Sequence, residues 1–134
     1  MELTRVMHVE DDESIRMVAE MALADVAGFE LLSCDGGQSA LEQAEAFAPE
    51  LILLDVMMPT MDGLQTLAAL RKLPSLATTP VVFMTAKIQQ AEKQQYLDTG
   101  AIAVVEKPFE PMELGDRLRE LYQQAMQDQQ AMKA

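Results

Sequence analysis

The strongest constraint on the fold is an alternation of short apolar runs with longer amphipathic segments along the chain. Apolar runs typical of strands occupy residues 4–9, 29–34, 51–54, 80–84 and 103–105. Segments typical of helices lie near residues 14–26, 37–47, 63–72, 88–99 and 111–126. Each strand is followed by a helix, and this order predicts an α/β fold with a five-stranded parallel sheet.

The helical segments carry local start and stop signals. Asp62 is a suitable N-cap for the third helix, and Gly28 and Gly100 stand where helices commonly end. Pro111 would fall in the first turn of the last helix. The connections are short, as in βα units, so right-handed crossovers bring the carboxyl ends of all strands to one edge of the sheet.

Size and charge narrow the functional classes. At 134 residues the chain predicts one domain, residues 1–122, followed by a helix end or Gln-rich tail at 123–134. The net charge of −12 argues against direct binding of nucleic acid or anionic membranes. No apolar run approaches the roughly 20 residues of a membrane span, and the first residues lack a signal-peptide profile. We therefore expect a cytoplasmic protein.

Polar side chains follow four of the predicted strands. Asp55 directly follows the third, Thr85 directly follows the fourth, and Lys107 comes after the fifth, while the acidic run 10–12 follows the first. Carboxylates gathered at one edge repel one another unless a cation joins them. Because all the candidate ligands are oxygens, the pattern predicts a hard ion, Mg²⁺ before Mn²⁺ or Ca²⁺.

The same edge carries groups suited to phosphoryl chemistry. Lys107 could neutralise phosphoryl oxygens, and the Thr85 hydroxyl could donate a hydrogen bond to them. Asp55 is the expected nucleophile, because a carboxylate can form an aspartyl phosphate.

These motifs together resemble the receiver domain of two-component response regulators, the CheY-like family, from about residue 4 to residue 122. The marks are Val9-Glu10-Asp11-Asp12, the segment from Leu54 to Gly63, Thr85-Ala86, and Lys107-Pro108-Phe109. The resemblance implies a doubly wound, flavodoxin-like (βα)5 fold with strand order 2-1-3-4-5.

The resemblance also implies a role for each site residue. Asp55 matches the phosphoacceptor, which takes its phosphoryl group from a phosphohistidine. Asp11 and Asp55 match direct Mg²⁺ ligands, the backbone carbonyl of Met57 matches the third protein ligand, and Glu10 matches a ligand that binds through water. Asp12 falls on a variable position, where it could contact the metal or serve as a helix-end charge.

Thr85 and Lys107 match the switch hydroxyl and the lysine that contact the new phosphoryl group. The bond before Pro108 is usually cis in this family. At position 104, where many members carry a Tyr or Phe ring that moves with the hydroxyl, this chain has Val104. We therefore expect phosphorylation to shift the fourth helix and the loop at 86–90 without a rotating ring.

Two further side chains bear on how long the phosphoryl group lasts. Met57 and Lys87 occupy positions that flank the path of the hydrolytic water in this family. Because a methionine side chain offers no useful hydrogen bond to orient water, we expect slow self-dephosphorylation.

Three less prominent features have structural interpretations. His8 lies inside the first strand and is interpreted as a core histidine with a satisfied ring, because a phosphoryl carrier must be exposed. Cys34 is interpreted as an inert packed thiol. For residues 123–134 we favour a helix end or linker over a partner-binding tail.

The resemblance implies a binding module controlled by phosphorylation rather than an enzyme. Its partners would be a sensor histidine kinase or histidine phosphotransfer protein and a downstream protein bound at the face of the last strand and the last two helices, through which it could also dimerise. One alternative is a relay carrier that passes the phosphoryl group to a second histidine protein. Another is a Mg²⁺-dependent phosphatase, which would need a second acid at the position of Met57.

Overall fold

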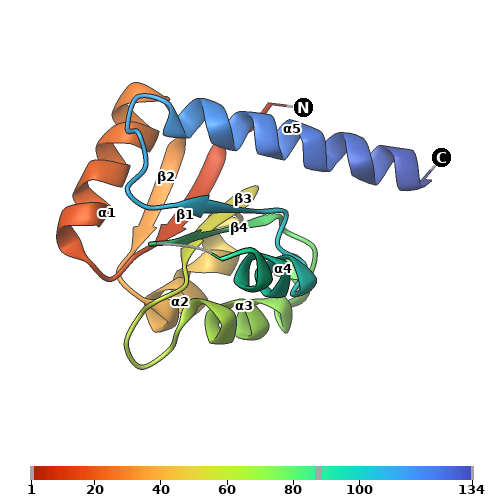
Figure 1. Ribbon diagram of the computed structural model, residues 1–134, viewed down its shortest axis with the longest axis horizontal. Helices are drawn as coiled ribbons and strands as arrows, with labels where there is room; N and C mark the ends of the chain where they lie inside the picture. Colours follow the sequence, from red (N-terminus) through yellow and green to blue (C-terminus); the bar gives the residue numbers. More distant parts are fainter. Residues whose placement is uncertain (1, 87–88, 134) are drawn as a thin grey trace.

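The computed structural model describes residues 2–86 and 89–133, which form one layered α/β unit around a parallel sheet (Figure 1). The sheet has five strands in the order β2-β1-β3-β4-β5, as expected. The strands are β1 Arg5–Val9, β2 Glu30–Cys34, β3 Leu51–Asp55, β4 Val81–Thr85 and β5 Ala103–Glu106. The last three extend one residue further than the apolar pattern predicts, so that Asp55 and Thr85 close their strands.

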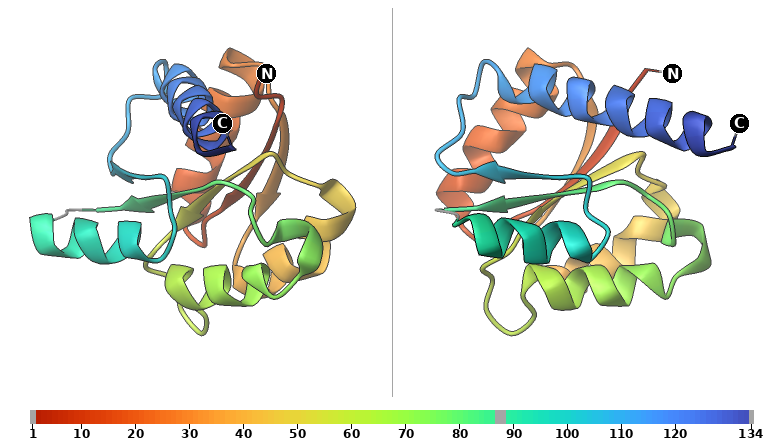
Figure 2. Two further views of the ribbon diagram at one scale, coloured as in Figure 1. Left: turned by 90° about the vertical axis from the view of Figure 1, so that its right-hand side faces the viewer. Right: turned by 45° about the vertical axis from the view of Figure 1, so that its right-hand side comes forward.

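Helices cover both faces of the sheet, as Figure 2 shows. One face carries α1 Glu13–Glu20 and α5 Leu114–Lys133, and the other carries α2 Gly37–Phe47, α3 Gly63–Arg71 and α4 Gln90–Asp98. Two apolar clusters fill the layers, one containing Leu23 and Leu118 and the other containing Leu67 and Phe83. This is the doubly wound fold that the sequence predicts.

The first helical segment departs from its expected form. It begins at Glu13 as an α-helix, but residues 21–26 continue as a π-helix, η1 Met21–Val26. The wider turns end where Ala27 meets α5: a side-chain carbon added at Gly115 would lie 2.3 Å from the Ala27 methyl group. Close packing of the two elements therefore accompanies the irregular turn.

The last helix also differs from the expected bounds. It begins at Leu114, because residues 111–113 form a turn held by Glu113 N–H donating to the Glu110 carbonyl oxygen at 3.0 Å. It continues beyond Met126, the last of its residues known to pack on the core, and projects past the sheet in Figure 1. The residues from 123 to 133 therefore belong to α5.

Two smaller elements complete the description. A short 3-10 helix, η2 Pro74–Leu76, joins α3 to β4. The sequence pattern begins the fourth helix at residue 88, which lies outside the described residues. In the part of the chain that the structure describes, no helix has the length and apolar character needed to cross a membrane.

Candidate functional site

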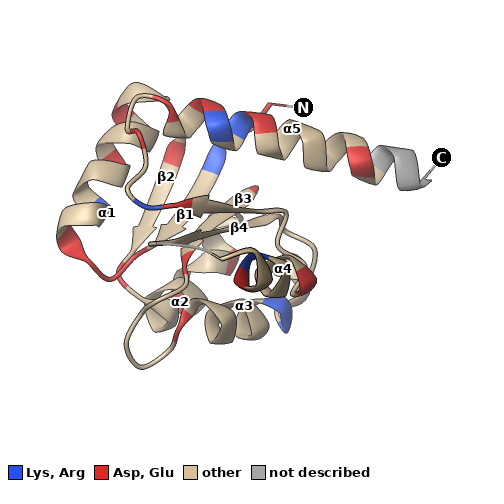
Figure 3. Ribbon diagram, viewed as in Figure 1, with Lys and Arg blue, Asp and Glu red and all other residues tan. Residues whose placement is uncertain are grey.

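Three carboxylates meet at the carboxyl edge of the sheet. Asp55 ends β3, and Glu10 and Asp11 follow β1, its neighbour in the sheet. One oxygen from each residue lies within 4.8 Å of the others. In Figure 3 the acidic loop between β1 and α1 and the basic segment after β5 lie at this same edge. The sequence-based prediction that these residues come together is therefore correct.

Lys107 places its ammonium group among these acids. Its Nζ lies 2.8 Å from Asp55 Oδ1 and donates a hydrogen bond to Glu10 Oε1 at 3.0 Å. Burial alone would lower the pKa of Lys107, but its bonds to Asp55 and Glu10 outweigh that effect and raise the pKa. The lysine is therefore held in its charged form beside the predicted nucleophile.

Among the residues that the structure describes, the Lys107 ammonium group does not by itself balance the three carboxylates. Burial raises the pKa of Glu10 to about 7, and although its hydrogen bond from Lys107 opposes the shift, repulsion by Asp55 adds to it. Asp55 Oδ2 is buried and has no hydrogen-bond partner among the described residues. A set of oxygen ligands with excess negative charge and an orphaned oxygen fits a hard divalent cation such as Mg²⁺.

The loop between β1 and α1 separates the roles of its two aspartates. Asp11 is exposed and belongs to the acidic cluster, whereas Asp12 is the N-cap of α1 and accepts a hydrogen bond from Ile15 N–H at 3.0 Å. The helix-end interpretation of Asp12 is thus supported. Arg16 Nη1 donates to the carbonyl oxygens of Glu10 at 2.9 Å and Asp11 at 3.3 Å, which ties this loop to the helix.

The loop after β3 is held close to Asp55 by a glycine. A side-chain carbon at Gly63 would lie 2.4 Å from the Asp55 carbonyl oxygen, so only glycine fits there without displacing the backbone. Asp62 caps α3 through a reciprocal pair of hydrogen bonds with Gln65. Met57 projects from this loop with 75% of its surface exposed.

Thr85 and Val104 lie on adjacent strands beside the acidic cluster. Thr85 is buried at the end of β4, and the backbone N–H of Lys107 donates to its carbonyl oxygen at 2.7 Å. Val104 pairs in register with Phe83, whose ring packs against the ring of Tyr96 of α4, a residue that sequence reasoning missed. The Lys107–Pro108 peptide bond is cis, as the resemblance implies. Lys87 lies outside the described residues.

Comparison with known proteins identifies the family. A model of the response regulator receiver domain matches residues 6–119. The chain belongs to this family.

The similar proteins include transcriptional regulators and a chemotaxis protein. The chain is 33% identical over 115 residues to the alkaline phosphatase synthesis transcriptional regulatory protein PhoP of Bacillus subtilis, covering 86% of this chain and 47% of that protein. It is 39% identical over 119 residues to the uncharacterized transcriptional regulatory protein YkoG of the same organism, covering 89% and 51%. It therefore spans about half the length of the curated relatives it matches. The solved structure of the chemotaxis protein CheY4 of Vibrio cholerae matches with a TM-score of 0.82 at 31% identity, over 89% of this chain and 98% of that one.

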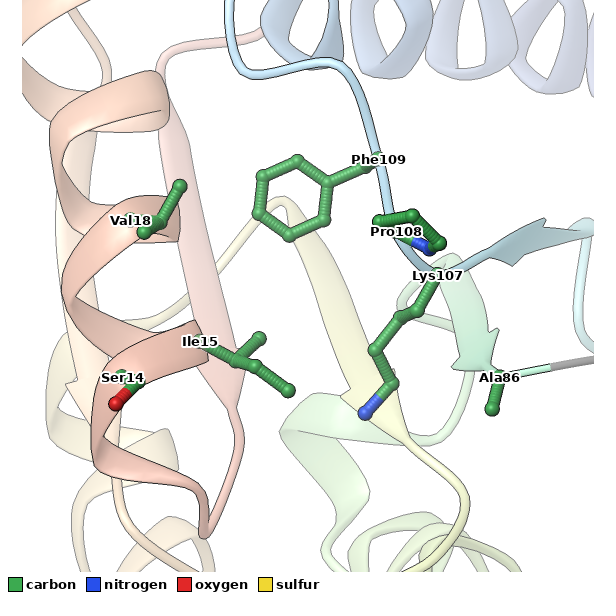
Figure 4. Close-up of a pocket in the computed structure, with 7 residues that line it drawn as sticks. All are labelled: Ser14, Ile15, Val18, Ala86, Lys107, Pro108 and Phe109. Carbon is green, nitrogen blue, oxygen red and sulfur yellow. The ribbon is translucent and has the colours of Figure 1, made fainter.

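A cleft that the sequence analysis did not identify opens beside the site of this receiver domain. It has a volume of about 490 Å³ and is mainly apolar. Figure 4 shows Ile15 and Val18 of α1 on one side, and Lys107, Pro108 and Phe109 on the other. The periodic apolar face of the first helix was visible in the sequence, but its open position beside residues 107–109 requires the fold.

His8 and Cys34 are both buried, as expected, but one prediction about His8 is wrong. Neither nitrogen of its ring has a hydrogen-bond partner among the described residues, so the ring is not satisfied. Burial, followed by the nearby positive charges of Lys107 and Arg16, lowers the pKa of His8 to about 4. Burial also raises the pKa of the Cys34 thiol, as expected for an inert packed cysteine.

Proposed function

We propose that this receiver domain accepts a phosphoryl group on Asp55 from a phosphohistidine of a sensor kinase or phosphotransfer protein. The observation that carries this proposal is the position of Asp55, 2.8 Å from Lys107 and within one cluster with Glu10 and Asp11. An Asp55 oxygen attacks phosphorus, and the O–P bond forms as the N–P bond breaks. The electron pair of that bond leaves with the imidazole nitrogen.

Each residue of the site has a task in this transfer. Lys107 neutralises charge on the phosphoryl oxygens, and the Thr85 hydroxyl donates a hydrogen bond to them. Asp11, Asp55 and the Met57 carbonyl oxygen would hold Mg²⁺ directly, and Glu10 would hold it through water. Bound Mg²⁺ supplies charge neutralisation at the transferred group.

The donor approaches over the cleft beside Lys107. Asp55 is only 1% exposed, and the cleft provides an open apolar surface between Ile15 and Phe109 next to it. A partner helix with apolar side chains around its phosphohistidine would cover this surface and exclude water. We assign this docking role to the cleft.

The phosphorylated domain then acts by binding rather than by turning over a separate substrate. We place it in the cytoplasm, where it binds a downstream protein at the α4-β5-α5 face and could form a dimer there. A relay that passes the group onward uses the same chemistry. A phosphatase is less well supported, because the residue two positions after Asp55 is the exposed Met57, which cannot protonate a leaving group.

Labelled phosphoramidate, a small donor with an N–P bond, tests the acceptor without knowledge of the kinase. Wild type should take up label in the presence of Mg²⁺, and Asp55→Asn should take up none. Asp62→Asn is the matched control, because asparagine caps a helix as well as aspartate does. Labelling of Asp55→Asn would overturn the assignment. Transfer of label from the wild type to added histidine phosphotransfer proteins would favour the relay.

A further inference from the structure

Helix α4 contributes one aromatic side chain to the core of the domain. Among the described side chains of this helix, Tyr96 alone is buried, at 9% exposure, and the others are polar or partly exposed. The Tyr96 ring lies against Phe83 of β4, with centroids 5.6 Å apart and planes inclined by 53°. Aromatic pairs at this distance pack favourably in tilted arrangements.

Phe83 links this contact to the phosphorylation site. It precedes Thr85 by two residues on β4, so both side chains point to the same face of the sheet. Phe83 is also the register partner of Val104 on β5, and all three apolar side chains, Tyr96, Phe83 and Val104, belong to one cluster. Val104 therefore lies in the same apolar layer as the Phe83 and Tyr96 rings.

Two acidic residues add to the effect of burial on the Tyr96 phenol. Burial raises the pKa of Tyr96, and the negative charges of Glu92 and Asp62 add to the shift. Asp62 caps α3 at the end of the loop that begins at Asp55. Tyr96 thus contacts β4 through Phe83, and the charge of Asp62, at the end of the loop that carries Met57, raises its pKa further.

We propose that Tyr96 couples phosphorylation of Asp55 to the exposed face of α4, in place of the ring that is absent at Val104. This inference rests on the proposed function. When Thr85 moves toward the phosphoryl oxygens, the end of β4 carries Phe83 with it, and α4 follows because Tyr96 is its buried anchor. Close-packed side chains respond to such shifts by repacking as a unit.

The composition of the chain allows a direct measurement. The chain has two tyrosines and no tryptophan, so Tyr122→Phe leaves Tyr96 as the only tyrosine fluorophore. Addition of Mg²⁺ and beryllium fluoride, a phosphoryl mimic, should change Tyr96 fluorescence and shift the backbone amide resonances of α4. Fluorine NMR of the bound mimic reports its binding independently.

Three variants test the coupling through Tyr96 separately from the phosphorylation of Asp55. With Tyr96→Leu, the mimic should still bind but the α4 amide shifts should be lost. With Tyr96→Phe, which keeps the ring, and with Tyr122→Phe on α5, the shifts should remain. Persistence of the shifts in Tyr96→Leu, their loss in Tyr96→Phe, or unchanged Tyr96 fluorescence with bound mimic would overturn the coupling. Binding that survives Asp55→Asn would instead overturn the proposed function.

Discussion

A glutamate lies at each edge of the sheet, and the fold shifts the pKa of these two glutamates in opposite directions. At the amino edge, Glu50 Oε1 accepts hydrogen bonds from Thr4 N–H at 2.9 Å, Thr4 Oγ1 at 2.8 Å and Arg5 N–H at 2.8 Å. Burial would raise the pKa of Glu50, but these bonds and the Arg5 charge outweigh it and lower the pKa. At the carboxyl edge, burial raises the pKa of Glu10 to about 7. The fold therefore favours the charged form of Glu50 and disfavours the charged form of Glu10.

The two ends of β1 repeat this contrast. Arg5, its first residue, bonds to Glu30 and to the carbonyl oxygens of Phe47 and Ala48, and its guanidinium lies 4.5 Å from the centre of the Phe47 ring. His8, three residues later, has no hydrogen-bond partner for either ring nitrogen among the described residues. The amino edge is built for stability, whereas the carboxyl edge keeps polar groups unsatisfied where a cation and a phosphoryl group are proposed to bind.

The largest effect is expected from replacing the positively charged side chain at each edge of the sheet, Lys107 at the carboxyl edge and Arg5 at the amino edge. Lys107→Gln should slow phosphorylation of Asp55 by roughly 10²- to 10³-fold, the usual cost of losing one group that stabilises developing charge. Arg5→Gln should lower the free energy of unfolding and leave the phosphorylation rate unchanged. Label uptake from phosphoramidate and urea unfolding measure the two quantities. Equal rates for Lys107→Gln and wild type would contradict the contrast between the edges.

His8 should make the domain less stable in acid. Its pKa falls from 6.5 to about 4 on folding, so between these pH values the unfolded chain binds more protons and stability falls as pH falls. The loss of unfolding free energy begins as the pH falls below about 6.5 and reaches about 3 kcal/mol by pH 4. Urea unfolding of His8→Leu, measured against wild type from pH 7 to pH 4, should show the mutant losing less stability by about this amount. Parallel curves would show that the ring finds a partner.

Most of the site could be predicted because parallel strands share one carboxyl edge. Once the apolar runs were placed, the positions of Asp55, Asp11 and Lys107 at strand ends were enough to bring them together. The same logic could not show that Glu10 would be buried and share Lys107 with Asp55, because burial depends on how the loops close over the edge.

Residues whose role depends on neighbours from other elements were harder to predict. The sequence shows that Val104 lacks a ring, but not that Tyr96 from α4 packs in the same cluster, since α4 has almost no apolar periodicity. His8 was placed correctly in the core, yet whether its ring nitrogens find donors or acceptors depends on side chains distant in sequence. The π-helical turns before Ala27 likewise accompany contact with Gly115, far along the chain.

Mg²⁺ should stabilise the fold by binding at the carboxyl edge of the sheet and not at the amino edge. At ten times its Kd, an ion that binds only the native state adds about 1.4 kcal/mol to the free energy of unfolding. Asp11→Asn should lose most of this increment. Glu50→Gln should keep it while lowering the basal stability by about 1 kcal/mol, because the backbone donors of Thr4 and Arg5 lose a charged acceptor. Thermal unfolding with EDTA or Mg²⁺ provides the measurement, and a full increment in Asp11→Asn would argue against the proposed ligand.

The smallest effect concerns an apolar side chain at the otherwise charged edge. Met57 is 75% exposed beside Asp55, where it can shield the phosphoryl group but cannot orient water. Met57→Asn should therefore speed dephosphorylation of Asp55 by several-fold to about tenfold, less than the roughly 10²-fold or more of a general base, because an amide can orient water but cannot take its proton. Leu64→Asn, an exposed apolar residue of α3, is the matched control and should leave the decay unchanged. Decay of labelled protein after removal of the donor measures both rates. If both variants decay at the wild-type rate, Met57 does not limit access of water, and the lifetime must be set by Lys107, Thr85 and the bound cation, groups that also promote the forward transfer.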